Sequence, residues 1–200
     1  MRESMSQKMT QEKLDEIIKD DLYGLQHKIL FKDDYSGLDF KTANLENTQF
    51  IGCDLRWSDL SKTTINEHTD ISATCLLDES TKMPKYPMAC PEEGSFIGWK
   101  KLHGRYKGRH CICIAKLLIP ETALRSSGIS RKCRCSEALV LEIRKLVGGK
   151  ELQRGNSIYN DWFIYTVGKP VAEPKFDTFR WHECAPGIHF YMTREEAVHR

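Results

Sequence analysis

A period of five residues between Ser36 and Ile65 constrains the fold of this 200-residue chain more than any other feature of its sequence. Six consecutive units follow one another: SGLDF, KTANL, ENTQF, IGCDL, RWSDL and SKTTI. The fifth position of each unit is large and apolar, and the third is nearly always small. The fifth positions are Phe40, Leu45, Phe50, Leu55, Leu60 and Ile65. Because neither a helix nor a strand has this period, the pattern predicts a coil that stacks like residues along its axis.

The stretches KTANLEN and CDLRWSDLSKT resemble the A(D/N)LXX motif of pentapeptide-repeat proteins. The resemblance implies a right-handed quadrilateral β-solenoid in which four units make one square turn, so that six units give about one and a half turns. Before the repeat, TQEKLDEIIKDDL predicts an amphipathic capping helix with Thr10 as its N-cap. The apolar face of this helix would hold Leu14, Ile17, Ile18 and Leu22.

After Gly94 the sequence predicts an α+β domain. Residues 110–119 and the segments IYNDWFIYTVG and GIHFYM are expected strands, and a capping box at 193–196 predicts a terminal helix. ALVLEIRKL could be a strand or a helix, and its alternation favours a strand. The expected mixed fold therefore comprises a capping helix and linker (1–35), a pentapeptide-repeat solenoid (36–80), a linker (81–94) and a basic α+β domain (95–200).

The second half also resembles a known, uncharacterised domain. FIGWKK, KLLIP, SRKCRCSEALVLEI, FIYTVGK and FRWHECAPGIHFYMTREEA are similar to a domain of phage, bacterial and giant-virus proteins that often follows pentapeptide repeats. The resemblance implies this architecture and a phage or viral setting, and it implies no catalytic residues.

Charge is distributed unevenly along the chain. Residues 1–80 hold 9 Lys and Arg against 16 Asp and Glu, whereas residues 99–134 hold 10 basic residues and one acidic residue, Glu121. We therefore expect the second half to bind an anion. The expected ligand-binding residues are Lys100, Lys101, Arg125, Arg131, Lys132, Arg134 and Trp99. Trp162 and Trp181 could also stack a base, although tryptophans are more often buried.

Two Cys-x-Cys pairs, Cys111/Cys113 and Cys133/Cys135, could together offer four thiolates to zinc. Structural zinc sites place their cysteines on turns, however, and Cys111 and Cys113 lie in an apolar segment that predicts a strand. We expect these side chains to pack in the core, and we expect no metal and no cofactor.

Three residues near the C-terminus could carry catalysis. His189 and Tyr191 would lie on one side of a strand, and Cys184 could form a nucleophile pair with a histidine. No third, orienting group stands at a recognisable spacing, so packing is the simpler interpretation. PGIHFYMTREEA is also loosely similar to a strand-to-helix stretch of ADP-ribosyltransferase-like folds, but neither the second nicotinamide-binding residue nor the catalytic acid is identifiable.

Taken together, these features predict a non-enzymatic, cytoplasmic, phage-encoded protein that captures an anionic partner, either a host defence protein or a nucleotide-like signal. A homodimer through one end of the solenoid is compatible with the repeat. The alternatives are a small enzyme that acts on a nucleotide, and an acidic repeat that mimics DNA to inhibit a DNA-binding protein. No apolar run is long enough to span a bilayer, and the N-terminal residues lack a secretory signal.

Overall fold

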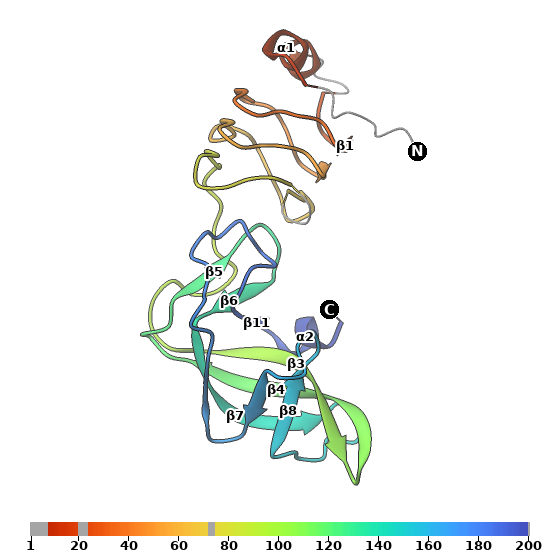
Figure 1. The fold of residues 1–200 in the computed structure, drawn as a ribbon, viewed down its shortest axis with the longest axis vertical. Coiled ribbons are helices and arrows are strands. Elements are labelled where there is room, and N and C mark those ends of the chain that lie inside the picture. Colours follow the sequence, from red (N-terminus) through yellow and green to blue (C-terminus); the bar gives the residue numbers. More distant parts are fainter. Residues whose placement is uncertain (1–7, 20–23, 72–74, 200) are drawn as a thin grey trace. The chain divides into compact units, whose positions relative to one another are not determined.

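The computed structural model describes residues 8–19, 24–71 and 75–199, and the chain divides into two compact units (Figure 1). Unit 1 contains Met1–Pro87 together with Gly128–Ser130 and Trp181–Cys184. Unit 2 contains Met88–Ser127, Arg131–Arg180 and Ala185–Arg200. Two short segments from the second half of the sequence therefore belong to unit 1.

Unit 1 begins with helix α1 (Gln11–Lys19), inside the segment for which the sequence predicts a helix. The hydroxyl of Thr10 accepts a hydrogen bond from the amide of Lys13 at 3.3 Å, as an N-cap residue does. Leu14 is fully buried, whereas Ile17 and Ile18 are half-buried. Leu22 lies outside the described residues.

In the repeat segment (residues 36–65) the chain returns beside itself about every 20 residues. Parallel bridges join Asp34 to Asp54, Asp39 to Asp59 and Asn44 to Thr64, and strand β1 (Ile29–Phe31) pairs in parallel with β2 (Gln49–Ile51). Five of the six fifth-position side chains are buried: Phe40, Leu45, Phe50, Leu55 and Leu60. The period of five thus determines which side chains are buried.

Unit 2 is built on a six-stranded antiparallel sheet. Its strands, in spatial order, are β10 (Pro170–Ala172), β7 (Glu137–Lys145), β4 (Arg109–Ile119), β3 (Phe96–Tyr106), β8 (Arg154–Ser157) and β9 (Ile164–Thr166). The two edge strands, β9 and β10, are joined by only three residues, 167–169. Because such a short link brings the edges together, the sheet curls into a nearly closed barrel.

A second sheet of three strands completes unit 2. It contains, in order, β11 (Ile188–Phe190), β6 (Cys133–Cys135) and β5 (Arg125–Ser127). Beyond β11, Tyr191 and Trp99 exchange two backbone hydrogen bonds of 2.8 Å, which joins this sheet to β3. The final helix α2 (Arg194–His199) packs against β3 and β4.

The core of unit 2 lies on the concave face of the barrel. Successive residues of a strand point to opposite faces, so Leu102 of β3 and its partner Cys113 of β4 both point inward. Leu117, Val140 and Tyr165 join them, and all five side chains are at most 1% exposed. Ile97, Trp99, Lys101 and the other odd-numbered residues of β3 consequently point outward.

The predicted mixed fold is wrong. The described chain is mostly β and has only two short helices, and unit 2 is a barrel-like antiparallel sheet rather than an α+β domain. A regular quadrilateral β-solenoid is not what the first half forms either, because its only strands among the described residues are β1 and β2, of three residues each. The α+β prediction failed because short strands such as β5, β6, β8 and β10 leave almost no periodic signal.

The individual strand predictions had mixed outcomes. β4 covers the predicted 110–119 strand, β7 confirms the strand interpretation of ALVLEIRKL, and the capping box before α2 is present. The predicted strand IYNDWFIYTVG is formed only in part: its first half is the turn between β8 and β9, and β9 occupies Ile164–Thr166. Within the described ranges, the helices are too short and too polar for any of them to cross a membrane.

Candidate functional site

Arg134, one of the predicted anion-binding residues, is buried and bound to the protein itself. Its side chain is 1% exposed, and its guanidinium donates hydrogen bonds to the carbonyl oxygens of Asp177, Pro186 and Phe179 at 2.9 to 3.1 Å. The guanidinium also lies 5.2 Å from the ring centroid of Phe176. Arg134 therefore fixes the loop that precedes β11 and is not exposed to a ligand.

Arg125 and Arg131 are also held by the protein. Arg125 donates hydrogen bonds to five backbone carbonyls, including those of Gly94 at 2.7 Å and Pro120 at 2.9 Å. Arg131 forms an ion pair with Glu196 of α2 at 2.7 Å. Lys132, which follows it, is half-buried. The cluster of basic residues around 125–134 is therefore mainly structural.

Lys100 points into the barrel. Its Nζ donates a hydrogen bond to the carbonyl of His189 at 2.8 Å and lies 5.7 Å from the ring centroid of Tyr165. Burial disfavours the charged amine and lowers the pKa of Lys100 to about 8. This lysine ties β3 to β11 and is closed to an external ligand.

The cysteines of the two Cys-x-Cys pairs lie in different sheets. Cys111 and Cys113 belong to β4, and Cys133 and Cys135 belong to β6. A hydrogen bond with Cys90, together with burial, raises the pKa of the Cys133 thiol. Across the described ranges, no group of three or more His, Cys, Asp or Glu side chains has a geometry that could hold a metal ion.

The three catalytic candidates are divided between the two units. Cys184 is exposed and belongs to unit 1, whereas His189 and Tyr191 belong to unit 2. His189 and Tyr191 are half-buried, and their backbone groups bond to Lys100 and Trp99 respectively. What the structure shows for these two residues is a backbone role in joining β11 to β3.

Several basic side chains that take no part in the contacts above face outward from the β3–β4 hairpin. In the antiparallel register Trp99 lies opposite Lys116, Lys101 opposite Ile114, and Arg105 opposite His110. Since opposite residues share a face, these side chains form one surface, which we call the basic face. It consists of Trp99, Lys101, His103, Arg105, His110, Ile112 and Lys116. All of them are half-buried or exposed.

Neighbouring strands extend the basic face with two arginines, one of which, Arg144, pairs with the carboxylates of Glu142 and Glu151. Arg144 of β7 lies opposite Ile114, and Arg154 of β8 shares the outward side with Asn156, which lies opposite His103. Glu142 is the carboxylate placed opposite Lys116, and it pairs with Arg144. Helix α2 packs against β3 and β4, and Ile114 is buried although its strand position faces outward.

Contacts within the basic face hold some of its side chains in place. The Nζ of Lys116 lies 5.8 Å from the ring centroid of Trp99, a cation–π distance. One guanidinium nitrogen of Arg105 lies 3.1 Å from Nε2 of His110. The face therefore presents an indole ring beside several cations, which suits a ligand that combines negative charge with flat rings.

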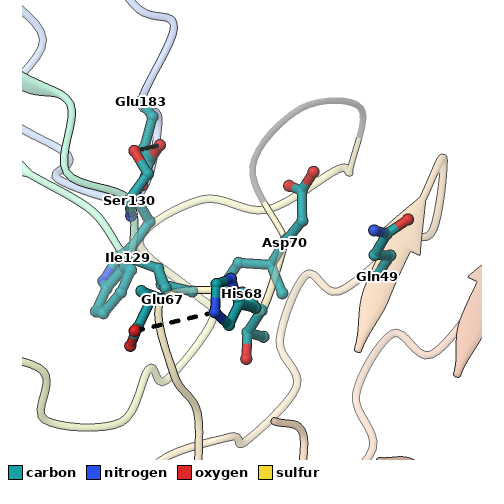
Figure 2. Close-up of a pocket in the computed structure, with 10 residues that line it drawn as sticks. Gln49, Glu67, His68, Asp70, Ile129, Ser130 and Glu183 are labelled. Carbon is teal, nitrogen blue, oxygen red and sulfur yellow. Dashed lines mark hydrogen bonds and ion pairs between the residues drawn. The ribbon is translucent and has the colours of Figure 1, made fainter. Parts of the chain in front are cut away.

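A cavity of about 260 Å³ lies in unit 1 and has the opposite character (Figure 2). Glu67, Asp70 and Glu183 line it, together with His68, whose Nε2 lies 4.0 Å from a carboxylate oxygen of Glu67. The carboxylate of Glu183 accepts hydrogen bonds from the amide and the hydroxyl of Ser130 at 2.7 and 2.5 Å. Three carboxylates repel an anion, so the expected ligand does not fit this cavity.

Comparison with known proteins places the basic face in a defined family. The model described as "Family of unknown function (DUF5758)" matches residues 86–197, more than half of the chain. The chain belongs to this family. The DUF5758 match contains every strand of unit 2, and with them the whole basic face. No curated protein and no solved structure matches the chain.

Two of the predicted ligand-binding residues, Trp99 and Lys101, lie on the basic face of the DUF5758 segment, but the sequence prediction did not include most of the surface around them. It omitted Arg105, Lys116 and Arg154 because it looked for density of charge instead of strand alternation. The signal was present: between Trp99 and Arg105 every second residue is aromatic or basic. The acidic cavity left no such signal, since its lining comes from segments more than 100 residues apart.

Proposed function

We propose that this protein is a non-catalytic binding protein whose anionic partner binds the basic face. The observation that carries the proposal is the register of β3 and β4, which places Lys101, Arg105 and Lys116 on one outward surface beside Trp99. Of the ten basic residues between 99 and 134, the buried or backbone-bonded ones stabilise the fold, and those on the outward side of the hairpin face water.

The proposed setting is the cytoplasm of a host cell in which a phage-encoded protein acts on a nucleotide-like signal or an acidic host protein. All eight cysteines are free thiols, which suits a reducing compartment.

The test measures binding to heparin, a soluble polyanion, by titration at several salt concentrations. The variant Lys101→Glu/Lys116→Glu should bind at least about tenfold more weakly and show a smaller salt dependence. The matched control Lys85→Glu/Lys175→Glu makes the same change in net charge at two exposed lysines outside β3 and β4, and it should bind almost like the wild type.

Two results would contradict the proposal. Equal weakening by both double variants would mean that net charge, not the basic face, attracts the polyanion. Conversion of NAD or a nucleotide, abolished by His189→Ala or Cys184→Ala, would show an enzyme. Circular dichroism of each variant checks that the sheet is retained.

A further inference from the structure

The turn between β8 and β9, residues 158–163, exposes two aromatic side chains almost completely. Tyr159 is 93% exposed and Trp162 is 92% exposed, the highest values among the large hydrophobic side chains of the described chain. Leaving an indole and a phenol ring in water forgoes the stabilisation that burial of so much apolar surface gives. Exposed rings at one tip of a fold indicate a contact surface.

The turn is held rigid by hydrogen bonds at both of its ends. The amide of Ser157 donates to the carbonyl of Phe163 at 2.9 Å, and the amide of Phe163 donates to the carbonyl of Asn160 at 3.0 Å. The side chain of Asn160 accepts a hydrogen bond from the amide of Trp162 at 3.0 Å. Because the backbone is already fixed, a ligand that stacks on these rings loses little free energy in ordering the turn.

The turn lies beside the basic face. Ser157 at the end of β8 pairs with Leu102, so the chain enters the turn at the level of Lys101 on β3. Arg154 begins β8, is exposed, and shares the outward side of the sheet with His103. A row of cations therefore leads from Arg105 and Arg154 along the outward side to Lys101, at the level where the chain enters the turn.

We infer that this surface binds single-stranded nucleic acid, with Tyr159 and Trp162 stacking on unpaired bases and the row of cations binding the phosphates. The inference rests on the proposed function and names its partner. Rings flanked by cations suit a strand that alternates flat bases with phosphates. In protein interfaces the central aromatic residues are instead surrounded by apolar neighbours and charged residues are depleted. Stacking between successive base pairs hides the flat faces of the bases inside a duplex, so the strand must be single.

Fluorescence anisotropy with a labelled oligo-dT and an oligo-U of about 15 nucleotides tests this inference. Trp162→Ala and Tyr159→Ala should each weaken binding about 5- to 150-fold, the range for loss of one stacked base. Trp162→Phe should retain much of the affinity, because a phenyl ring still stacks. Both positions are exposed, so these variants should keep the wild-type fold. Val147→Ala, at an apolar side chain that is 74% exposed, is the matched control and should bind like the wild type.

Two further measurements sharpen the assignment. A blunt duplex of the same length should bind at least about tenfold more weakly than the single strand at equal salt. Asp161→Asn removes a carboxylate that lies between Tyr159 and Trp162 in the sequence and should strengthen binding of the oligonucleotide, since it removes a negative charge from the turn that meets the strand.

The inference is overturned if neither oligonucleotide shows saturable binding, if Trp162→Ala binds as tightly as the wild type, or if the duplex binds as well as the single strand. Tighter binding of polyglutamate than of oligo-dT would also overturn it, because the partner would then be an acidic protein. The heparin titration keeps the two proposals separate. Heparin binding that needs Lys101 and Lys116, without any role of Trp162 in oligonucleotide binding, refutes the nucleic-acid inference alone.

Discussion

The buried amine of Lys100 should make the stability of unit 2 rise with pH in a range where most proteins lose stability. The pKa of Lys100 is lowered from 10.5 to about 8, because its side chain is buried in the barrel. The unfolded chain therefore binds a proton that the folded chain has released between about pH 8 and 10.5. Below that range both states are protonated, and the cost of burying the charge is fully present.

The size of the effect follows from the pKa difference. A shift from 10.5 to about 8, at about 1.4 kcal/mol per unit, corresponds to ~3 kcal/mol across the whole range. Replacement by methionine removes the titrating group while nearly conserving the volume. The free energy of unfolding of the wild type, measured relative to Lys100→Met, should therefore rise by roughly 1 kcal/mol or more from pH 7.5 to pH 9.

The relative measurement is necessary because other groups oppose this trend. Burial raises the pKa of the Cys135 thiol to about 12, so its contribution to stability falls as pH rises through the ordinary thiol range. Burial, the largest cause of this shift, is common to both proteins and cancels in the difference, while the charge of Lys100 itself lowers the pKa of Cys135 only as a lesser cause.

Urea unfolding under reducing conditions supplies the assay. It is followed by far-UV circular dichroism, to which unit 2 contributes nearly all the strands. Lys101→Met is the control: its side chain lies on the outer face, in contact with water, so its removal takes no buried charge from the fold. A difference between wild type and Lys100→Met that stays constant from pH 7.5 to 9 would show that Lys100 is not buried as described, and would refute the reasoning.

Two further predictions test how β11 and its preceding loop are held. Arg134→Lys should lower the free energy of unfolding by about 2–4 kcal/mol, because an ammonium cannot donate to the carbonyls of Asp177, Phe179 and Pro186 together. Wild-type stability of this variant in the same urea assay would contradict the role. Gly98→Ala should lower the free energy of unfolding by about 1–3 kcal/mol, since its Cβ would lie 2.6 Å from the ring of Phe190. Adding Phe190→Leu should restore part of the loss. An unchanged melting temperature for Gly98→Ala alone would refute the contact.

Sequence alone could foresee the burial pattern of the repeat segment, because each unit repeats the same local geometry. A fixed apolar residue at every fifth place leads directly to the buried side chains from Phe40 to Leu60. The overall fold class could not be foreseen in the same way. Strands of three or four residues such as β5 and β8 are defined by their partners in the sheet, not by a pattern of their own.

The sequence could not predict which arginines bond to the backbone of the protein itself. Arg125 and Arg134 have the same side chain as Arg105, but their guanidinium groups are bound by carbonyls. The carbonyls that Arg134 binds belong to residues 43 to 52 positions further along the chain. Whether an arginine meets a ligand or its own backbone depends on such distant segments, and no local count of charges contains that information.

Lys100 and Lys101 show how strand alternation separates a buried side chain from one on the outer face. They are adjacent in sequence, yet one lies in the barrel with its amine on the carbonyl of His189, and the other stands on the outward surface between Trp99 and His103. Only the alternation of the strand separates them. A shift of β3 by one residue relative to β4 would exchange the two faces, sending Trp99 and Arg105 inward. The hydrogen bond of Lys100 and the close packing of Gly98 on Phe190 oppose such a shift, so the same contacts that fix the barrel keep the basic face turned outward.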